Sequence, residues 1–269
     1  MPEEIREEMY QKFQSPSSES RAEQQARFYN ASVGDLPGFY CEKCKNNGFI
    51  AYAVDDECRL RECLCMQTRR VQENMRESGL GDLLGLYTFD NYETPDLWRE
   101  TTKNRALEYV SDFSKKDNAL KWFCVFGAVG SGKTHICTAI CNKILKNGGK
   151  VAYMLWREES VKLKAVINDY GEYKRIFKPF KEANTLYIDD FLKCKKEQSP
   201  TEADINLAFE LINHRYYMPG NRTIISSEKT FDEISEFDEA IGSRISQRSG
   251  QYYSMEISQG DGKNWRLRA

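Results

Sequence analysis

The sequence GAVGSGKT, residues 127–134, is the stretch from which the rest of the chain can be interpreted. It follows the apolar run WFCVFG at 122–127 and precedes a predicted helix over 133–147. Glycines let such a loop bend until its backbone N–H groups point inward, and the positive end of the following helix adds to their attraction for phosphate. Lys133 would then reach the β- and γ-phosphates of a nucleotide, and Thr134 would ligate Mg²⁺.

We expect a nucleotide to be held along this loop and the residue after it. The predicted contacts are Gly127, Ala128, Val129, Gly130, Ser131, Gly132, Lys133, Thr134 and His135. His135 also fits a purely structural place in the helix. A chance glycine-rich turn would not need the strand, the lysine and the threonine together, so the loop predicts binding of ATP with Mg²⁺.

The run TLYIDD at 185–190 supplies the acidic partner of this loop. Its apolar part predicts a buried strand, and Asp189 and Asp190 come at the carboxyl end, where parallel sheets bind ligands. We expect Asp189 to hold the Mg²⁺ shell and Asp190 to orient or deprotonate the attacking water. An apolar run that ends in two aspartates is a weak signal alone, and the phosphate loop is what gives it meaning.

Short apolar runs alternate with helical stretches in this part of the chain. The expected strands are 122–127, 151–155, 185–190, 222–227 and 251–258. The expected helices are 133–147, about 157–183, 202–217 and 231–248. Runs of this kind suit strands that are buried on both faces. The pattern therefore predicts an α/β fold, with a mostly parallel five-stranded sheet flanked by helices.

Five of the nine cysteines lie between Cys41 and Cys65, with the spacing of a metal site. Cys41 and Cys44 form one close pair and Cys63 and Cys65 another, and two such pairs can close a tetrahedral thiolate shell around Zn²⁺. Cys58 could replace either member of the second pair. Four thiolates leave no open coordination position on the metal for a reactant. We therefore expect a structural zinc that stabilises a segment too small to fold alone. Free or redox-active thiols are the alternative.

Composition favours a globular protein without export or membrane segments. Apolar residues make up 40% of the chain, and the acidic start MPEEIREEMY lacks the apolar centre of a signal peptide. No apolar run reaches the length of about 18 residues that a membrane helix needs. We therefore expect a cytoplasmic protein with reduced thiols. The net charge is −2, so any nucleic-acid site must be a local patch.

One such patch is the interval 156–184, which is longer than a plain crossover helix. It interleaves bases with aromatic residues, a combination that can follow single-stranded DNA by charge and stacking. These residues are Arg157, Lys162, Lys164, Lys174, Arg175, Lys178 and Lys181, with Tyr170, Tyr173, Phe177 and Phe180. A solvated amphipathic helix explains them equally well. The stretch LKCKKE at 192–197 is a second basic candidate.

Many collinear blocks between residues 41 and 269 resemble the DnaC/DnaI/IstB branch of AAA+ ATPases, and within it the DnaC-like replication proteins of Firmicutes phages and mobile elements. The blocks are RECLCMQTRR, TFDNYET, GAVGSGKTHICTAI, LYIDDFLK, PTEADINLAFELINHRY, TIISSE, AIGSRI and NWRLR. Members of that branch load a hexameric replicative helicase onto single-stranded DNA. Their N-terminal part contacts the helicase, and their ATPase part self-associates and binds DNA.

The resemblance implies further residues at the nucleotide site. Ser227, or Ser226, matches the first sensor of AAA+ proteins, and Arg244 matches the arginine finger, which acts on ATP held by a neighbouring subunit. Phe89 and Tyr92 in TFDNY would lie near the adenine, although core packing accounts for them as well.

The match to the AAA+ pattern is incomplete at two positions. The AAA+ pattern has Glu where this chain has Asp190, and the shorter side chain predicts slow hydrolysis that DNA or a partner would stimulate. Arg266 is the nearest match to a second sensor, and a frayed basic C-terminus is the other interpretation.

These arguments divide the chain into three parts. We expect a helical partner-binding segment over 1–40, a zinc module with a linker helix over 41–85, and an AAA+ ATPase domain over 86–269. The predicted function is ATP-dependent loading of the replicative helicase onto single-stranded DNA. One alternative is an IstB-type transposition helper that partners a transposase, against which the cysteine module and the NWRLR ending argue. The other is a nucleotide-binding zinc adaptor with negligible turnover.

Overall fold

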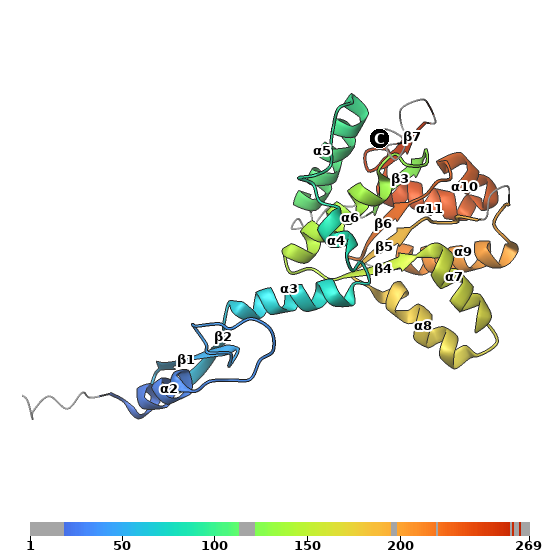
Figure 1. Ribbon diagram of the computed structural model, residues 1–269. Coiled ribbons are helices and arrows are strands. Elements are labelled where there is room, and N and C mark those ends of the chain that lie inside the picture. Colours follow the sequence, from blue (N-terminus) through green and yellow to red (C-terminus); the bar gives the residue numbers. More distant parts are fainter. Residues whose placement is uncertain are drawn as a thin grey trace, which may run out of the picture. The chain divides into compact units, whose positions relative to one another are not determined.

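The computed structural model describes residues 19–112, 122–194, 198–218, 220–258, 260 and 264. The chain forms two compact units, Met1–Arg70 and Val71–Ala269, which are taken one at a time below (Figure 1). Among the described residues, no helix combines the length and the apolar character needed to cross a membrane.

The first unit consists of a helix, a hairpin and the start of a second helix. Its elements are α2 (Arg21–Ala31), β1 (Phe49–Val54), β2 (Glu57–Glu62) and the beginning of α3 (Cys65–Glu77). Ser20 and Glu23 cap the first turn of α2 reciprocally. Asp55 and Asp56 both have positive φ, which makes the tight turn of the antiparallel hairpin. The rest of the segment expected over 1–40 includes residues 1–18, which lie outside the described residues.

The second unit contains a five-stranded parallel sheet, as the sequence predicts. Its strands are β3 (Trp122–Gly127), β4 (Val151–Leu155), β5 (Thr185–Asp189), β6 (Arg222–Ser226) and β7 (Ser254–Ile257). They lie in the order β4-β5-β6-β3-β7, and every neighbouring pair is parallel. The carboxyl ends of β3, β5 and β6 therefore meet at one edge of the sheet, where the phosphate loop and the two aspartates follow.

Helices connect these strands. They are the end of α3, α4 (Leu83–Leu86), α5 (Leu97–Ser111), α6 (Lys133–Lys146), α7 (Trp156–Ala165), α8 (Tyr170–Glu182), α9 (Glu202–Tyr217), α10 (Phe231–Phe237) and α11 (Glu239–Ser249). Two of the stretches expected as single helices are each broken in two. The amide of Glu172 donates to the carboxylate of Asp169, which starts α8, and the amide of Ile241 donates to Asp238, which starts α11. An aspartate cap begins a new helix and so interrupts each stretch.

Side chains on alternate positions of the strands enter two separate hydrophobic clusters. Phe123, Val125 and Tyr187 pack with α5 and α6 on one face, and the alternating residues pack with α7, α8, α9 and α11 on the other. In Figure 1 the strands lie between these helices. Burial on both faces is why the strands read as continuous apolar runs.

Residues 71–85 belong to the second unit, whereas the sequence-based division places them with the zinc module. Leu80 is buried in the first of the two clusters, among side chains of α5 and α6. The carbonyl of Ser78 accepts a hydrogen bond of 2.8 Å from the amide of Tyr153 at the edge strand β4. These contacts tie the end of α3 and the following turn to the core of the second unit.

Arg215 is fully buried on α9 and caps α8. Its guanidinium donates to the carbonyls of Phe180, Lys181 and Ala183 at distances of 3.0–3.1 Å. It also donates to the hydroxyl of Thr223 on β6. Burial lowers the pKa of Arg215 to about 9. The guanidinium therefore supplies partners for carbonyl groups that the end of α8 would otherwise leave without hydrogen bonds. Through the same group, α9 is also joined to β6.

Candidate nucleotide and metal sites

The phosphate loop joins β3 to α6 through a backbone that only glycine tolerates at its ends. Gly127 has φ 98°, and a Cβ there would lie 2.2 Å from the carbonyl oxygen of Ile257 on the neighbouring strand. Gly132 has φ 90° at the start of α6, beside the ring of Tyr92. The hydroxyl of Ser131 donates to the carbonyl of Ala128 at 2.8 Å and closes the loop. The N-terminus of α6 is thereby left facing the cavity described below.

Lys133 is folded over this loop. Its ammonium donates to the carbonyls of Gly127 and Ala128 at 2.8 and 2.6 Å, and its side chain is buried. Burial lowers the pKa of Lys133. The two carbonyls hold the charge at the mouth of the loop, where phosphate oxygens could replace them as partners.

Asp189 is the centre of a network of hydroxyl groups. Thr134 donates to it at 3.2 Å, Tyr187 at 2.8 Å and Tyr153 at 3.1 Å, and Ser226 donates as well. The network holds a buried carboxylate beside the threonine hydroxyl at the end of the phosphate loop. A carboxylate and a hydroxyl at this spacing are the hard oxygen donors that Mg²⁺ prefers, so Thr134 and Asp189 could hold Mg²⁺.

Asp190 follows with a left-handed backbone, at φ 55°. Its carboxylate lies 3.0 Å from the ammonium of Lys193, which also lies 2.9 Å from Glu228. Burial raises the pKa of Asp190. Asp190 thus faces the same cavity as Lys133, and it contacts Lys193, to which the sequence analysis gives no role at the nucleotide site.

A cavity of about 290 Å³ brings these groups together. It is lined by Tyr87, Asn91, Tyr92, Glu93, Arg99, Gly130, Ser131, Gly132, Lys133, Thr134, His135, Asp190, Lys193 and Glu228. Segments from four distant parts of the chain contribute to it. The combination of a phosphate loop, cations and carboxylates is suited to a nucleotide with its metal ion.

The aromatic residues expected near the base lie in different places. Tyr92 lines the cavity, and burial raises its pKa to about 12. Phe89 packs against the hydrophobic core and is not among the lining residues. His135 lines the cavity between Tyr87 and Tyr92, and its Nε2 contacts the carbonyl of Thr88 at 2.9 Å. The imidazole therefore packs the TFDNY segment onto α6 as well as facing the site.

The two serines considered as the first sensor have different surroundings. The hydroxyl of Ser226 contacts the carboxylate of Asp189, whereas that of Ser227 donates to the carbonyl of Phe191 at 2.6 Å. Consecutive side chains of a strand point to opposite faces, so only one can face the carboxylate. The geometry therefore favours Ser226 over Ser227 as the first-sensor residue.

Arg244 lies on α11 and is absent from the lining of the cavity in its own chain. Its guanidinium lies over the rings of Phe209 and Tyr216 on α9, at 5.3 and 5.6 Å from their centroids, and donates to the carbonyl of Ala240. It is half-buried and remains accessible at the surface. This position is compatible with a role for Arg244 as an arginine finger on ATP bound by a neighbouring subunit, and that role stays a prediction. Arg266 lies outside the described residues.

Four cysteines meet in the first unit as the spacing predicts. The sulfurs of Cys41, Cys44, Cys63 and Cys65 all lie within 4.8 Å of one another. The distance is 3.8 Å from Cys41 to Cys63 and 3.5 Å from Cys44 to Cys65. Zn–S bonds of about 2.3 Å in a regular tetrahedron would place sulfurs about 3.8 Å apart. The group could therefore hold Zn²⁺, and Cys58, on β2, is not part of it.

Most bases of the interval 156–184 are paired with acids. Ion pairs join Lys164 to Asp204, Lys181 to Glu210, Arg175 to Glu172, Lys162 to Glu159 and Lys178 to Glu182. Phe177 is buried in the core, while Tyr170 is 76% exposed with Lys174 over its ring. The start of α8 is therefore the part of this interval that offers both a base and an exposed ring.

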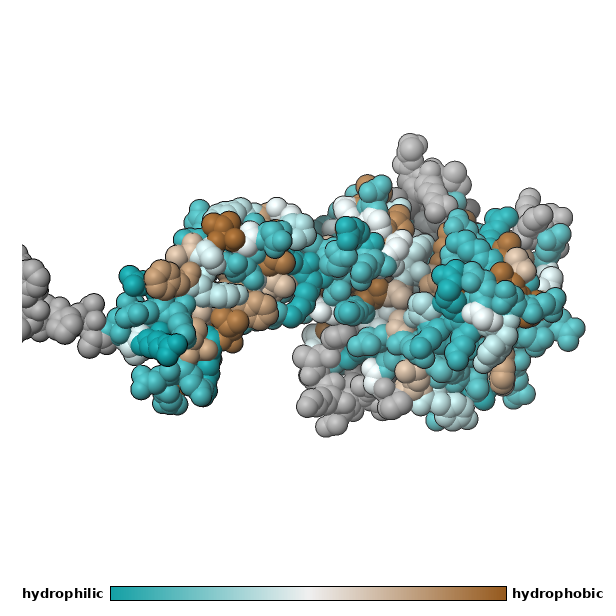
Figure 2. Space-filling view, turned by 90° about the horizontal axis from the view of Figure 1, so that it is seen from below, coloured by the Kyte–Doolittle hydropathy of each residue, from teal (hydrophilic) through white to brown (hydrophobic). Residues whose placement is uncertain are grey.

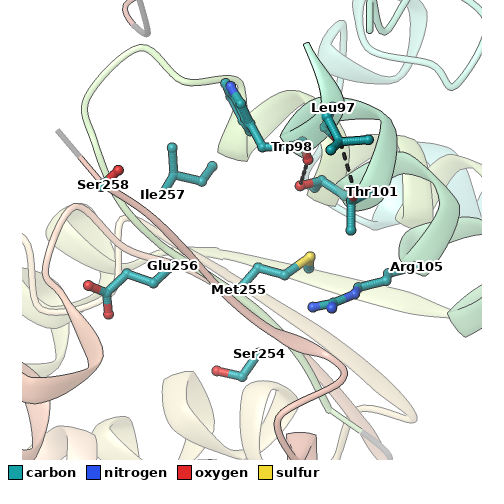
Figure 3. Close-up of a pocket in the computed structure, with 10 residues that line it drawn as sticks. Leu97, Trp98, Thr101, Arg105, Ser254, Met255, Glu256, Ile257 and Ser258 are labelled. Atoms are coloured by element: carbon teal, nitrogen blue, oxygen red, sulfur yellow. Dashed lines mark hydrogen bonds between the residues drawn. The ribbon is translucent and has the colours of Figure 1, made fainter. Parts of the chain in front are cut away.

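A larger hollow of about 560 Å³ lies between α5 and β7 (Figure 3). Leu97, Trp98 and Arg105 of α5 face Met255 and Ile257 of β7 across it. It contains none of the residues that the motifs predict. Size alone therefore does not mark the nucleotide site.

Several residues around Asp189 and the nucleotide cavity were not identified from the sequence. Tyr187 lies two residues before Asp189, so it shares that face of β5, and Tyr153 is its register partner on β4. This alternation is a local signal that could have identified Tyr187. Lys193 and Glu228 carry no such signal, because their meeting depends on the pairing of β5 with β6.

Comparisons with known proteins agree with this site. The model of the family described as IstB-like ATP binding protein matches residues 47–262. The uncharacterized protein YqaM of Bacillus subtilis (strain 168) is 30% identical over 198 residues, which cover 71% of this chain and 62% of YqaM. This chain therefore spans less than two thirds of that relative's length. The phage-like element PBSX protein XkdC of the same organism is 26% identical over 224 residues, or 81% of this chain and 82% of XkdC.

A solved structure gives the same picture of the fold. The crystal structure of the DnaC helicase loader matches with a TM-score of 0.54 and 18% identity, over 66% of this chain and 98% of that one. Likeness at this level of identity shows a shared fold.

Proposed function

This chain belongs to the family of IstB-like ATP binding proteins, as its motif blocks predict, and we propose that it hydrolyses ATP in order to load a hexameric replicative helicase onto single-stranded DNA. The observation that carries the proposal is the meeting of Lys133, Thr134 and Asp189 at one edge of the sheet, with Asp190 in the same cavity. These groups can bind a nucleotide and also cleave it.

Each group would have a distinct part in hydrolysis. Mg²⁺, when bound by Thr134 and Asp189, would neutralise charge on the phosphates. Lys133 would exchange its two carbonyl partners for phosphate oxygens. Asp190 would accept the proton of the attacking water, and Arg244 of a neighbouring subunit would stabilise the charge that develops. Because Asp190 is shorter than glutamate, we expect slow turnover that rises when DNA or the partner aligns the site.

The first unit is suited to docking a partner. We propose that Zn²⁺ bound by its four cysteines holds this unit folded, with the helicase as the docking partner. On one face of this unit, Figure 2 shows brown, hydrophobic residues among hydrophilic neighbours. Across the first unit, several large apolar and aromatic side chains are exposed. These are Phe28, Val33, Phe39, Tyr40, Phe49, Tyr52, Leu60 and Leu64. So many exposed apolar side chains on one small unit are typical of a protein-binding surface.

Single-stranded DNA would bind to the ATPase unit. Tyr170 and Lys174 at the start of α8 combine an exposed ring with a base, the pair of features that stacking on single strands requires. Five of the other bases of this helical pair are engaged by acids, so we assign those five a smaller share of binding.

A second candidate is a transposition helper, which the IstB description of the family favours. It would use the same ATPase and DNA-binding groups with a transposase as partner. A zinc adaptor with negligible turnover is the third candidate, favoured by Asp190 alone.

The three candidates differ in partner and in turnover. We expect the purified chain to retain the replicative helicase of its host in a pull-down and to increase helicase activity on circular single-stranded DNA in the presence of ATP. Retention of a transposase in place of the helicase would favour the transposition helper. Absence of ATP turnover with both DNA and helicase present would favour the adaptor.

A further inference from the structure

A charged cluster lies in the nucleotide cavity where β5 and β6 end. Its members are Asp190, Lys193 and Glu228, and all three line the cavity together with Lys133 and Thr134. The ammonium of Lys193 lies 3.0 Å from Oδ2 of Asp190 and 2.9 Å from Oε1 of Glu228. One cation is thus shared by two carboxylates, one from each strand end.

The turn that carries Asp190 is fixed through its backbone. Asp190 and Leu192 both have φ 55°, an uncommon conformation outside glycine. The amide of Phe191 donates to the carbonyl of Ser226 at 2.8 Å, and the amide of Lys193 donates to the carbonyl of Asp190 at 2.9 Å. These bonds set the position of the main chain. They do not set the rotation of the Asp190 carboxylate, which contacts the ammonium of Lys193.

We propose that Lys193, anchored by Glu228, is the positioning residue that holds the Asp190 carboxylate toward the water attacking the γ-phosphate. This inference rests on the proposed ATPase function and goes beyond it by assigning two residues outside the phosphate loop and the aspartate pair. Without the ammonium of Lys193 between them, Asp190 and Glu228 would be two like charges at the ends of neighbouring strands, in contact with no shared side chain. Repulsion would then turn the shorter carboxylate away from the water.

A purely structural role for this ion pair predicts something different. Each of the three side chains is more than a quarter exposed, and pairs of this kind contribute little to stability because water screens them. Loss of Lys193 should therefore leave the chain folded. A large effect on the rate of hydrolysis would need a cause within the site.

The test is a set of steady-state ATPase measurements on the full chain with single-stranded DNA and helicase. We expect Lys193→Met to lower kcat by about 10-fold or more while KM for ATP changes by less than about 3-fold. Lys193→Arg should recover most of the rate because it keeps the charge between the carboxylates. Lys229→Met is the matched control, since Lys229 lies nearby and pairs with Glu233 outside the cavity.

Glu228→Gln tests the anchor. We expect a smaller fall in kcat, about 3-fold, and no further loss when it is combined with Lys193→Met, because Glu228 acts through Lys193. A Lys193→Met variant with unchanged or higher kcat, an effect confined to KM, or independent additive losses in the double variant would overturn the inference while leaving the ATPase function intact. Absence of turnover in the wild-type chain would overturn both.

Discussion

Among the described residues, the buried cluster of the first unit is made of cysteines, whereas the second unit has two hydrophobic clusters on opposite faces of a sheet. In that part of the first unit, Ile50 and Met66 are the further apolar side chains packed against the cysteines. The second has large residues such as Trp122, Tyr187 and Phe191 fully buried. The comparison indicates that hydrophobic burial stabilises the second unit, whereas the first unit depends on the metal that we propose its cysteines bind.

The largest effect should come from removing one zinc ligand. We predict that Cys63→Ser abolishes the metal site and unfolds the first unit, while the second unit keeps its unfolding transition. Elemental analysis should give one zinc per wild-type chain, and hydrogen exchange should report a loss of protection confined to the first unit, in α2 and the hairpin. Cys58→Ser is the control, because Cys58 lies outside the four-cysteine group. Loss of zinc in that control instead would show that the ligands are misassigned.

Arg244→Ala should leave both units folded and prevent hydrolysis. We predict a fall in kcat of about 10³-fold with nearly normal ATP binding, as for arginine fingers in other systems. Mixing Arg244→Ala with Lys133→Ala should restore some activity, increasingly with protein concentration, because one interface then pairs an intact loop with an intact finger. Arg248→Ala, which removes a guanidinium from the same Tyr216 ring, should remain active. Mixed assemblies without any restored activity would place the role of Arg244 within its own subunit.

Arg215→Met tests how much a single buried cap contributes to the stability of the second unit. Its loss leaves the carbonyls at the end of α8 without partners, which should destabilise the second unit by about 2–4 kcal/mol. Chemical denaturation monitored by fluorescence measures this change, and zinc content should be unaffected. Lys178→Met, which removes an exposed ion pair of the same helix, should change stability by less than about 0.5 kcal/mol. Equal effects of the two variants would contradict the capping role.

The smallest of these effects concerns ligand binding alone. Lys133→Ala should weaken binding of a fluorescent ATP analogue by about 10–100-fold, since a hydrogen bond to a charged group contributes about 1.5–3 kcal/mol. Circular dichroism should show a folded chain. Lys143→Ala, at the exposed end of the same helix, should bind normally. A folded Lys133→Ala variant with wild-type affinity would exclude the loop as the phosphate site.

The sequence by itself determined the features that depend on neighbouring residues. The phosphate loop is one uninterrupted string, the cysteine pairs have a fixed spacing, and the strands are apolar because both of their faces are buried. From these followed the five-stranded parallel sheet and the family, which the structure and the comparisons confirm. The breaks before α8 and α11 were also encoded locally, by the caps Asp169 and Asp238, but the apolar periodicity runs across them.

Only the tertiary structure decided which distant side chains meet. The choice between Ser226 and Ser227 depends on which one faces Asp189 from the adjacent strand, and a shift of one residue would exchange them. Lys193 and Glu228 come together because β5 pairs with β6, and Arg215 meets the end of α8 because α9 packs there. The physical reason is the same in each case: a contact between residues far apart in the chain is set by strand order and helix packing, which no short stretch of sequence specifies.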